Sequence, residues 1–540
     1  MKQRAELHTP QPAISPPSED PLDPYTYTSG RWLRCDKLER DGRYIKFDFD
    51  ELRKRVIELC HGAASITNYE KNEGGFNRVF IFTCDNGKRV IARLPTRVAG
   101  PSRLTTNSEV ATIKYLQLTT TVPIPTILDW SDDSSNAIGS EYIIMEHAAG
   151  VQLHQKWPTM SMEQKVDCIR AISENIQQIA AIEFPVYGSL YFADIPIDFA
   201  PKVPLAPGFC IGPHCGTRYW DCNIGDARDY TSIKPNRGPC KSSFSLLFQQ
   251  CSLQVRAGFD LASYCDGLID TGLSRLPPAA KPLPENPPFH GSVATHTRLL
   301  GVGRDVIQKL SQDPRIREIT APTLHHPDLH KRNIFVSDED PTTITALIDW
   351  QSSSIEPAFE YADETPDFAA PPGPTPPSEA PPAPADIIAQ LCSQAFDACL
   401  QVLVPRLFAA RALDEDLLRP FRYCHRTWRD SAVVFRQELI EISRRWTELG
   451  LPDQCPYPLP TSDDLVVYRR EYEDFLVAQN LKMKLVDRLD TTTDGWVPTE
   501  SWDATKSAHK QAFEVIVRAV TDDQSMSEGD LRRIWPFDIE

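Results

Sequence analysis

The stretch Leu324–Trp350 decides how this chain folds, and it reads L-H-H-P-D-L-H-K-R-N-I-F-V, then nine mostly polar residues, then A-L-I-D-W. His326, Asp328 and Asn333 fit the spacing H-x-D-x-x-x-x-N. Asp349 follows Asp328 by 21 residues, at the end of a short apolar run. Four polar positions matched in order, with apolar runs beside them, favour a functional loop over chance.

Apolar segments on both sides of an acidic turn predict a β-hairpin within this stretch. Residues 333–336 and 344–348 are rich in β-forming side chains, and Asp338–Pro341 stands between them. Such a pattern is typical of strand, turn and strand. The hairpin would return Asp349 to the side of Asn333, so that carboxylate and amide oxygens lie together.

Oxygen groups gathered in this way suit phosphoryl transfer, whose transition state asks a protein mainly to position groups and to neutralise spread negative charge. We assign Asp328 as the base that orients the attacking hydroxyl. Asn333 and Asp349 would bind Mg²⁺, which prefers hard oxygen ligands. Two alternatives remain: these residues are caps or Asx-turns, or His326 and His330 form an H-x-x-x-H metal site, for which no third ligand has a recognisable spacing.

The same block resembles the aminoglycoside and choline kinase-like phosphotransferase superfamily, whose loop reads H-x-D rather than the H-R-D of most protein kinases. The resemblance implies an α+β, bilobal protein-kinase-like fold, with a small β-sheet N-lobe, a mainly helical C-lobe and an α-helical C-terminal extension. It also implies ATP and Mg²⁺ as cofactors. A protein kinase is disfavoured, because no A-P-E motif follows Asp349 and Pro327 replaces the H-R-D arginine.

Residues 25–148 are predicted to form the N-lobe. A helix is expected over Asp50–His61, and an Asp85-Asn86-Gly87 turn marks a hairpin. The expected strands are Ile66–Lys71, Phe76–Thr83, Lys88–Leu94, Thr126–Trp130 and Glu141–Glu146.

Nucleotide contacts are predicted first at the turn that contains Gly74, Gly75, Phe76 and Asn77. Glycine lets backbone N–H groups approach phosphates closely. Taken alone, a Gly-Gly turn is usually only a turn, and the H-x-D loop downstream is what favours a nucleotide-covering role.

Further nucleotide contacts are predicted at the following strands. The segment Val90-Ile91-Ala92-Arg93 stands at the place of the kinase V-A-I-K, which makes Arg93 and Glu109 of the next helix the predicted phosphate clamp. An arginine there keeps the charge but differs in plane and length from lysine. Glu146 and Ala148 fall where a hinge would present backbone groups to adenine.

Residues 149–364 are predicted to form the C-lobe, with an insertion at 184–290. Cys210, His214, Cys215 and Cys222 in this insertion lack the spacing of a tetrahedral zinc site, so we interpret them as structural. Residues 365–384 read as a Pro-rich linker. Residues 385–540 read as the helical C-terminal part of the C-lobe, with helices expected at Ile387–Arg411, Cys424–Leu449, Asp463–Leu489 and Trp502–Val520.

Composition limits the class of protein. The chain has 540 residues, of which 41% are apolar, and a net charge of −17 from 57 basic and 74 acidic residues, which argues against a nucleic-acid partner. No run of about 18 apolar residues predicts a membrane span. The 14 cysteines form no C-x-x-C pair, which favours reduced thiols in an intracellular protein. Residues 1–24 are Pro-rich and acidic and are predicted to be disordered, not a signal or transit peptide.

A closer resemblance rests on several segments, among them E-G-G-F-N-R-V-F, V-I-A-R-L-P, E-Y-I-I-M-E and H-P-D-L-H-K-R-N-I-F-V. They are similar to a fungal phosphotransferase group related to the protein called altered inheritance of mitochondria nine. The resemblance covers about residues 25–360 well and implies that arginine at position 93 is a feature of the group. It implies a mitochondrial location, whereas the acidic N-terminus favours the cytoplasm.

The leading prediction is an ATP-dependent phosphotransferase that moves the γ-phosphate to a hydroxyl of a small molecule. The alternative is a catalytically weak pseudokinase or scaffold linked to mitochondrial maintenance. This alternative is suggested by Arg93, which stands where kinases have a lysine. The predicted partners are a nucleotide and an unidentified small-molecule acceptor. The sequence predicts no oligomeric state.

Overall fold

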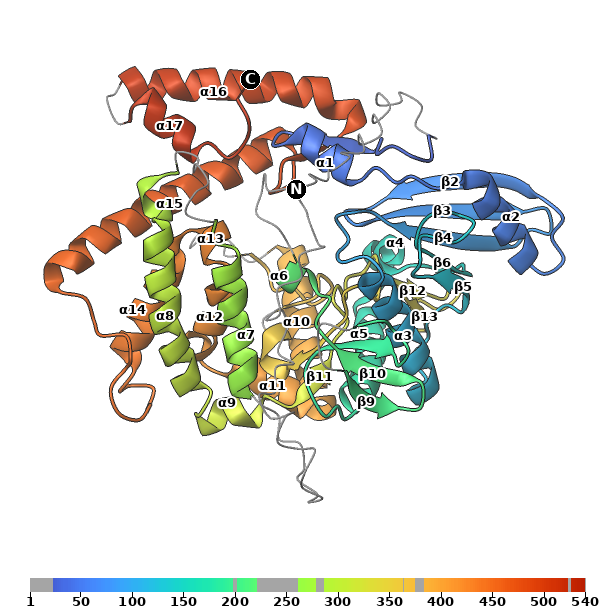
Figure 1. Cartoon of the computed structure of the whole chain (residues 1–540), viewed down its shortest axis with the longest axis horizontal. Coiled ribbons are helices and arrows are strands. Elements are labelled where there is room, and N and C mark those ends of the chain that lie inside the picture. Colours follow the sequence, from blue (N-terminus) through green and yellow to red (C-terminus); the bar gives the residue numbers. More distant parts are fainter. Residues whose placement is uncertain are drawn as a thin grey trace, which may run out of the picture.

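The computed structural model describes residues 23–197, 202–220, 261–277, 286–362, 364–373, 383–522 and 526–539. The predicted disorder of residues 1–22, the part of the insertion that holds Cys222, and residues 374–382 of the predicted linker lie outside these ranges. Two lobes are visible in Figure 1, and long helices at the C-terminal end lie along the top of the helical part of the C-lobe. The predicted fold class, bilobal and kinase-like, is confirmed.

The N-lobe is built on a five-stranded antiparallel sheet with the order β2-β3-β4-β6-β5. Its strands are β2 (Ile66–Glu73), β3 (Asn77–Cys84), β4 (Arg89–Pro95), β5 (Ile127–Ser131) and β6 (Tyr142–Glu146). Every second residue of β3 is buried, as a period of two requires when one face meets a core. All five predicted strands are present, and the Asp-Asn-Gly turn joins β3 to β4 as expected.

Two helices lie against this sheet. Helix α2 (Phe49–Leu59) begins at an Asp48 cap, whose side chain accepts from the Glu51 N–H, and it covers an aromatic core that contains Phe80 and Phe82. It ends two residues before the predicted end at His61. Helix α3 (Leu104–Thr119) is buried along most of its length, and its residues belong to the core between the lobes.

The C-lobe places a small β-structure under the N-lobe sheet. Strands β12 (Ile334–Val336) and β13 (Ile344–Leu347) form the predicted hairpin, and β7 (Val151–Gln152) pairs with β12. Helix α5 (Met162–Ala180) begins at a capping box between Ser161 and Gln164, as the sequence predicts. The remaining short elements of this part are α4 (Leu153–Lys156), β8 (Ser189–Phe192), β9 (Val203–Ala206), β10 (Phe209–Gly212), α6 (Thr217–Trp220), β11 (Pro322–Leu324) and β14 (Ile355–Pro357).

A helical layer completes the C-lobe. Two of the helices predicted for this layer are each divided in the structure. The helix predicted over Ile387–Arg411 is two helices, because Pro405 has no N–H for the helical hydrogen bond and begins the second one. The helix predicted over Cys424–Leu449 is interrupted at Ser431, whose φ of 84° a helix cannot contain. The layer consists of α7 (Leu261–Ser274), α8 (Val293–Leu310), α9 (Pro314–Glu318), α10 (Pro384–Leu403), α11 (Pro405–Ala412), α12 (Glu415–Cys424), α13 (Thr427–Asp430) and α14 (Ala432–Arg445).

The two ends of the described chain meet in a separate packing unit, which we call the cap. Strand β1 (Gly30–Trp32) pairs antiparallel with β15 (Trp496–Pro498). Helix α1 (Asp36–Gly42) follows β1, and the C-terminal helices are α15 (Ser462–Leu489), α16 (Trp502–Asp522) and α17 (Glu528–Ile534). A core of its own joins Leu33 to the C-terminal helices. The N-terminal segment therefore belongs to both the N-lobe and the cap (Figure 1).

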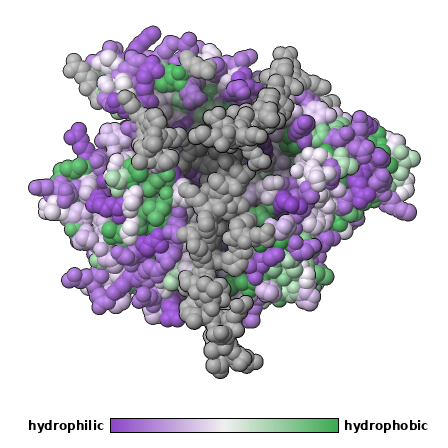
Figure 2. Space-filling model, viewed as in Figure 1, coloured by the Kyte–Doolittle hydropathy of each residue, from purple (hydrophilic) through white to green (hydrophobic). Residues whose placement is uncertain are grey.

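On the face that Figure 2 shows, apolar residues occur in scattered groups among hydrophilic ones, a pattern normal for protein surfaces. Within the described ranges, no helix is both long and apolar enough to cross a bilayer.

Candidate active site

The loop of residues 325–333, which we call the H-x-D loop, connects β11 to β12 and is fixed by a half-buried histidine. The His326 Nδ1 atom accepts from the Asp328 N–H at 3.1 Å, and Nε2 lies 2.9 Å from the Ile348 carbonyl oxygen, to which it donates. Burial lowers the pKa of His326, which favours the neutral ring that this pattern requires. The loop is thereby held against the residue that follows β13.

Asp328 presents an oriented carboxylate at the surface of this loop. Its side chain is 51% exposed, and Oδ1 lies 3.1 Å from His330 Nε2. The Asn333 side-chain amide donates to Oδ2 and to the Asp328 backbone oxygen, each at 2.9 Å. Two donors therefore fix the rotation of the carboxylate, and each oxygen keeps a lone pair free for a further hydrogen bond.

Asp349 stands at the end of the hairpin, opposite the H-x-D loop. The register places Ile334 against Leu347, and the Ile348 N–H donates to the Asn333 oxygen at 3.0 Å. Asp349 has a φ of 67°, a conformation that costs a non-glycine residue on the order of 1–3 kcal/mol and that occurs often at functional sites. The buried Trp350 next to it supports this turn with an Nε1 hydrogen bond to the Leu347 oxygen at 3.1 Å.

Arg93 joins the two lobes at the centre of the site. Its Nη1 lies 2.5 Å from Glu109 Oε1, and its Nη2 lies 2.8 Å from Asp349 Oδ1. Nη2 also donates to Gln351 Oε1 at 2.5 Å. Burial raises the pKa of Glu109 to about 7, against the opposing effect of the Arg93 charge. One guanidinium therefore bridges the α3 glutamate and the acid that follows β13.

The glycine-containing turn is exposed, and an arginine contacts its backbone. Gly74 and Gly75 lie between β2 and β3, and the Arg43 Nε donates to the Gly75 oxygen at 3.1 Å. Asn77 does not face an open space, because its side-chain amide lies against Gln351 and Arg93. With its oxygen toward Arg93, this amide accepts from Nη2 at 2.6 Å and from Nε at 3.0 Å. The adjacent Phe76 is 42% exposed.

The predicted hinge lies at the end of β6. The Glu146 N–H donates to the Thr126 oxygen at 2.9 Å, so it serves the sheet, and the Glu146 side chain is exposed. Ala148 is buried, and its oxygen lies 2.8 Å from His147 Nδ1. The structure thus places these two residues beside β4 at the edge between the lobes, with the Glu146 N–H already engaged.

Two polar residues of the site were missed by sequence reasoning. Gln351 lies two positions after Asp349, is 6% exposed, and touches both Arg93 and Asn77. Its place in the motif is a signal that could have found it. Arg43 had no such signal, because it stands 32 residues before the Gly75 that it contacts and only tertiary structure brings the two together.

The donors of Asn333 and Asp349 fit a hard cation. Asn333 uses its Nδ2 on Asp328, which leaves its amide oxygen as the group that can bind a metal. Among the described residues, Asp349 is paired through Oδ1 only, which leaves Oδ2. No group of three or more His, Cys, Asp or Glu side chains in the described ranges is placed to hold a metal ion. One carboxylate and one amide oxygen are the donor types that Mg²⁺ takes together with phosphates and water.

These features define the class of protein. A five-stranded antiparallel lobe, an arginine–glutamate pair between sheet and helix, an H-x-D loop and an acid after the following hairpin together make a kinase-like phosphotransferase fold. The resemblance predicted from the sequence is confirmed.

Known relatives are fungal proteins, while no protein-family model matches the chain. A subtelomeric hrmA-associated cluster protein of Aspergillus fumigatus is 34% identical over 308 residues, covering 54% of this chain and 58% of the relative. The match thus spans little more than half of that relative's length. Altered inheritance of mitochondria protein 9 of Kluyveromyces lactis is 23% identical, covering 89% of this chain and 87% of that protein.

Solved structures with a similar course of the chain are small-molecule kinases. Aminoglycoside phosphotransferase APH(2'')-Ib with bound ADP is 11% identical, with a TM-score of 0.33, and the match covers 72% of this chain and 98% of that one. The Plasmodium vivax ethanolamine kinase is 13% identical, with a TM-score of 0.33, over 73% of this chain and 85% of that one. At these scores, we base the assignment of the fold on the topology and contacts described above.

Proposed function

We propose that the protein is an ATP-dependent, Mg²⁺-dependent phosphotransferase that acts on a hydroxyl group of a small molecule. The observation that carries the proposal is that Asp328, Asn333 and Asp349 of the C-lobe come together with the Arg93–Glu109 pair of the N-lobe where the two lobes meet. These elements come from both lobes and from residues more than 200 positions apart, so chance polar contacts do not account for them.

In the proposed reaction, Asp328 accepts a hydrogen bond from the acceptor hydroxyl and takes its proton as the oxygen attacks. The new bond forms between that oxygen and the γ-phosphorus, and the bond to the bridging oxygen breaks, so that ADP leaves. Asn333 and Asp349 would hold Mg²⁺, which supplies charge neutralisation on the phosphates. Arg93 adds a fixed positive charge at the same place.

The experiment that tests the proposal compares nucleotide binding and turnover in isosteric variants. We expect Mg²⁺-ATP to raise the melting temperature of the wild type, since a ligand at a hundredfold excess over Kd stabilises a protein by about 2.7 kcal/mol. The shift should be lost in Asp349→Asn and kept in Asp328→Asn, which should lack ADP release. Glu339→Gln, an exposed acid in the turn of the hairpin, is the matched control.

A second candidate is a scaffold without turnover. The contact that favours it is Arg93 Nη2, which occupies Asp349 Oδ1 and Gln351 at once and would have to share Asp349 with a metal. If no nucleotide shifts the melting temperature in the presence or absence of Mg²⁺, the scaffold becomes the better account.

We further propose a mitochondrial location, which rests on the names of relatives such as the Kluyveromyces lactis protein. Imaging of a C-terminal fluorescent fusion against a matrix marker tests it. Exclusion of the fusion from mitochondria would reject this location.

A further inference from the structure

A large cavity lies behind the H-x-D loop, and Arg93 is not among the residues that line it. It has a volume of about 1810 Å³ and is lined by the end of α5, by β11, by the H-x-D loop and by α10 and α11. Small-molecule sites usually have volumes of roughly 300–1,000 Å³. Asp328 and His330 are among the lining residues, so the cavity adjoins the proposed base.

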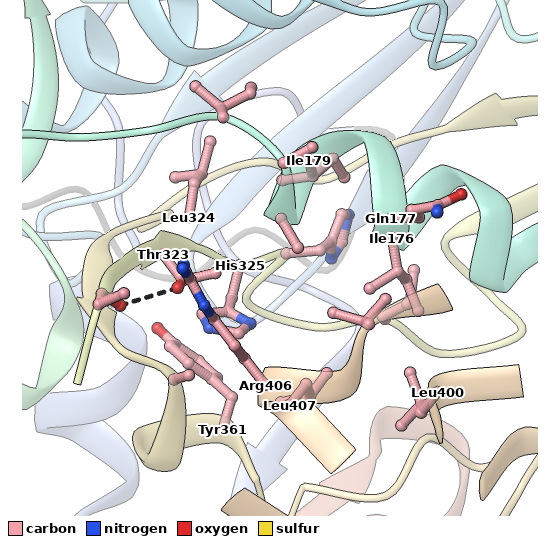
Figure 3. A pocket seen from close by; sticks show the side chains of 18 of the residues that line it. Ile176, Gln177, Ile179, Thr323, Leu324, His325, Tyr361, Leu400, Arg406 and Leu407 are labelled. Atoms are coloured by element: carbon pink, nitrogen blue, oxygen red, sulfur yellow. Dashed lines mark hydrogen bonds between the residues drawn. The ribbon is translucent and has the colours of Figure 1, made fainter. Parts of the chain in front are cut away.

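One side of the cavity is apolar. Ile176 and Ile179 of α5, together with Leu400 of α10, line it, and Leu407 of α11 adds to this wall. Figure 3 shows these side chains around the right and lower parts of the cavity. An apolar ligand that packs against these walls is stabilised by about 25 cal/mol for each Å² of apolar surface that is removed from water.

The opposite side is polar and carries an exposed cation, Arg406. Figure 3 shows Arg406 extending from α11 toward Thr323 and His325. Arg406 makes no ion pair with any residue of the described ranges. His325 stacks on the Tyr361 ring, with a centroid distance of 4.4 Å, and its buried Nε2 has no hydrogen-bond partner within the described part of the chain.

The charges of the cavity do not suit a polycation. The acidic lining residues Glu183 and Glu364 are exposed, and Asp328 already accepts from His330 and Asn333. Arg406 and Arg411 also line the cavity. Positive and negative side chains therefore nearly balance, and an aminoglycoside, which carries several positive charges, would find no dense acidic surface.

We propose that this cavity binds an amphiphilic alcohol, with an apolar chain between α5 and α10, a single carboxylate or phosphate-like group at Arg406, and a hydroxyl near Asp328. The proposal rests on the proposed phosphotransferase function in one respect only, namely that the bound alcohol is the acceptor. It names a substrate class that differs from aminoglycosides and other polycations.

Binding can be measured without nucleotide, on the full chain, with the fluorescent probe 11-(dansylamino)undecanoic acid. We expect saturable fluorescence that 12-hydroxydodecanoate displaces and that dodecylamine and kanamycin displace poorly. Ile176→Trp, at a half-buried position of the apolar wall, should abolish binding by filling the cavity. Arg406→Ala should weaken it by about threefold to fivefold, the scale of an exposed ion pair. Leu476→Trp and Arg470→Ala, both on the exposed surface of α15, are matched controls that should bind as the wild type does.

Two results would overturn the inference: equal probe binding by wild type and Ile176→Trp, or displacement by kanamycin but not by 12-hydroxydodecanoate. The acceptor role is tested separately by ADP release with Mg²⁺-ATP, where 12-hydroxydodecanoate should stimulate release and dodecanoate, which has no hydroxyl, should not. Displacement without any stimulation rejects the acceptor role. Loss of the Mg²⁺-ATP melting shift rejects the phosphotransferase proposal itself, and probe displacement still decides the ligand class.

Discussion

At the scale of single residues, Arg93 decides how the two lobes meet. Its guanidinium is planar and forked, so Nη1 reaches Glu109 while Nη2 reaches Asp349 and Gln351. An ammonium group is a single point of charge and cannot occupy both positions. The arginine at this place therefore has a geometric role that lysine would not fill.

We predict that Arg93→Lys weakens the binding of Mg²⁺-ATP by about tenfold or more, equivalent to roughly 1.4 kcal/mol, because the single nitrogen of lysine cannot reproduce the forked contacts of Nη1 and Nη2. Isothermal titration of nucleotide checks this. Arg89→Lys is the matched control, since Arg89 is on the same strand and makes an exposed pair with Glu70 at 3.0 Å. Faster turnover in Arg93→Lys than in the wild type would contradict the prediction and identify Arg93 as a restraint.

At the scale of elements, the cap is connected to the glycine-containing turn. Arg43 donates to the Gly75 oxygen and stacks on the Trp32 ring at 4.3 Å. Trp32 lies in β1, which pairs with β15 of the cap. Glu73, just before the turn, accepts from the backbone N–H groups of Thr28 and Ser29, each at 2.8 Å. The N-terminal segment therefore links the C-terminal helices to the turn.

We predict that Gly30→Ala loosens this link. A Cβ at Gly30 would lie 2.6 Å from the Val497 oxygen and would also meet the Trp496 ring, so β1 and β15 could no longer pair closely. The cost should be about 1–3 kcal/mol, as for other overpacked sites. Limited proteolysis should then cleave the C-terminal helices faster. Unchanged cleavage together with unchanged stability would show that the strand pair does not hold the cap.

A second prediction at this scale concerns the packing of α8 on α14. Gly303 lets the Phe435 ring approach, since a Cβ there would lie 2.5 Å from the ring. Gly303→Ala should destabilise the protein by about 1–3 kcal/mol in urea unfolding. The control lies two residues away: a Cβ at Gly301 meets nothing within 4 Å. Gly301→Ala should be neutral or stabilise the helix by about 0.5–1 kcal/mol, and equal effects of the two changes would refute the packing argument.

At the scale of the whole molecule, buried titratable groups set the response to pH. Burial lowers the pKa of His214, His296 and His325 to about 4. Burial raises the pKa of Glu109 and Glu438 to about 7. Because of these histidines, the folded protein loses stability as the pH falls from about 6.5 to 4, since over this range the unfolded chain binds protons that the folded chain does not. The two glutamates have the opposite effect: the stability that they contribute is present below about pH 4.5 and is lost as the pH rises to about 7.

We predict that His296→Leu isolates the histidine contribution. His296 is 0% exposed, and its shift corresponds to a stability difference on the order of 3 kcal/mol across the titration. The free energy of unfolding of the wild type should therefore fall relative to that of the variant as the pH is lowered from 6.5 to 4, measured by urea unfolding. Exposed His61→Leu is the control. A constant difference between wild type and His296→Leu over this range would show that His296 has the same pKa in the folded state as in the unfolded chain.

The sequence predicted the elements whose signals are local. The N-lobe strands, the capping box of α5 and the hairpin that returns Asp349 toward Asn333 all follow from alternation, turn residues and caps, which act over a few residues. The helices predicted near Pro405 and Ser431 were too long, because the apolar periodicity of the sequence continues across positions where the backbone cannot remain helical. For the same reason, helix α2 ends at Leu59, two residues before the predicted end.

By itself, the sequence determined the local elements and most of the residues that meet at the candidate site, because motif spacing and hydrophobic period are written along the chain. The fold class followed from the resemblance of its motifs to a known superfamily. Only the tertiary structure decided what those residues touch. It placed Asp349 and Gln351 on one guanidinium, Arg43 on the glycine-containing turn, β1 against β15, and a large cavity behind the H-x-D loop. These contacts join segments far apart in sequence, and such pairings depend on the packing of the whole chain, which local patterns do not encode.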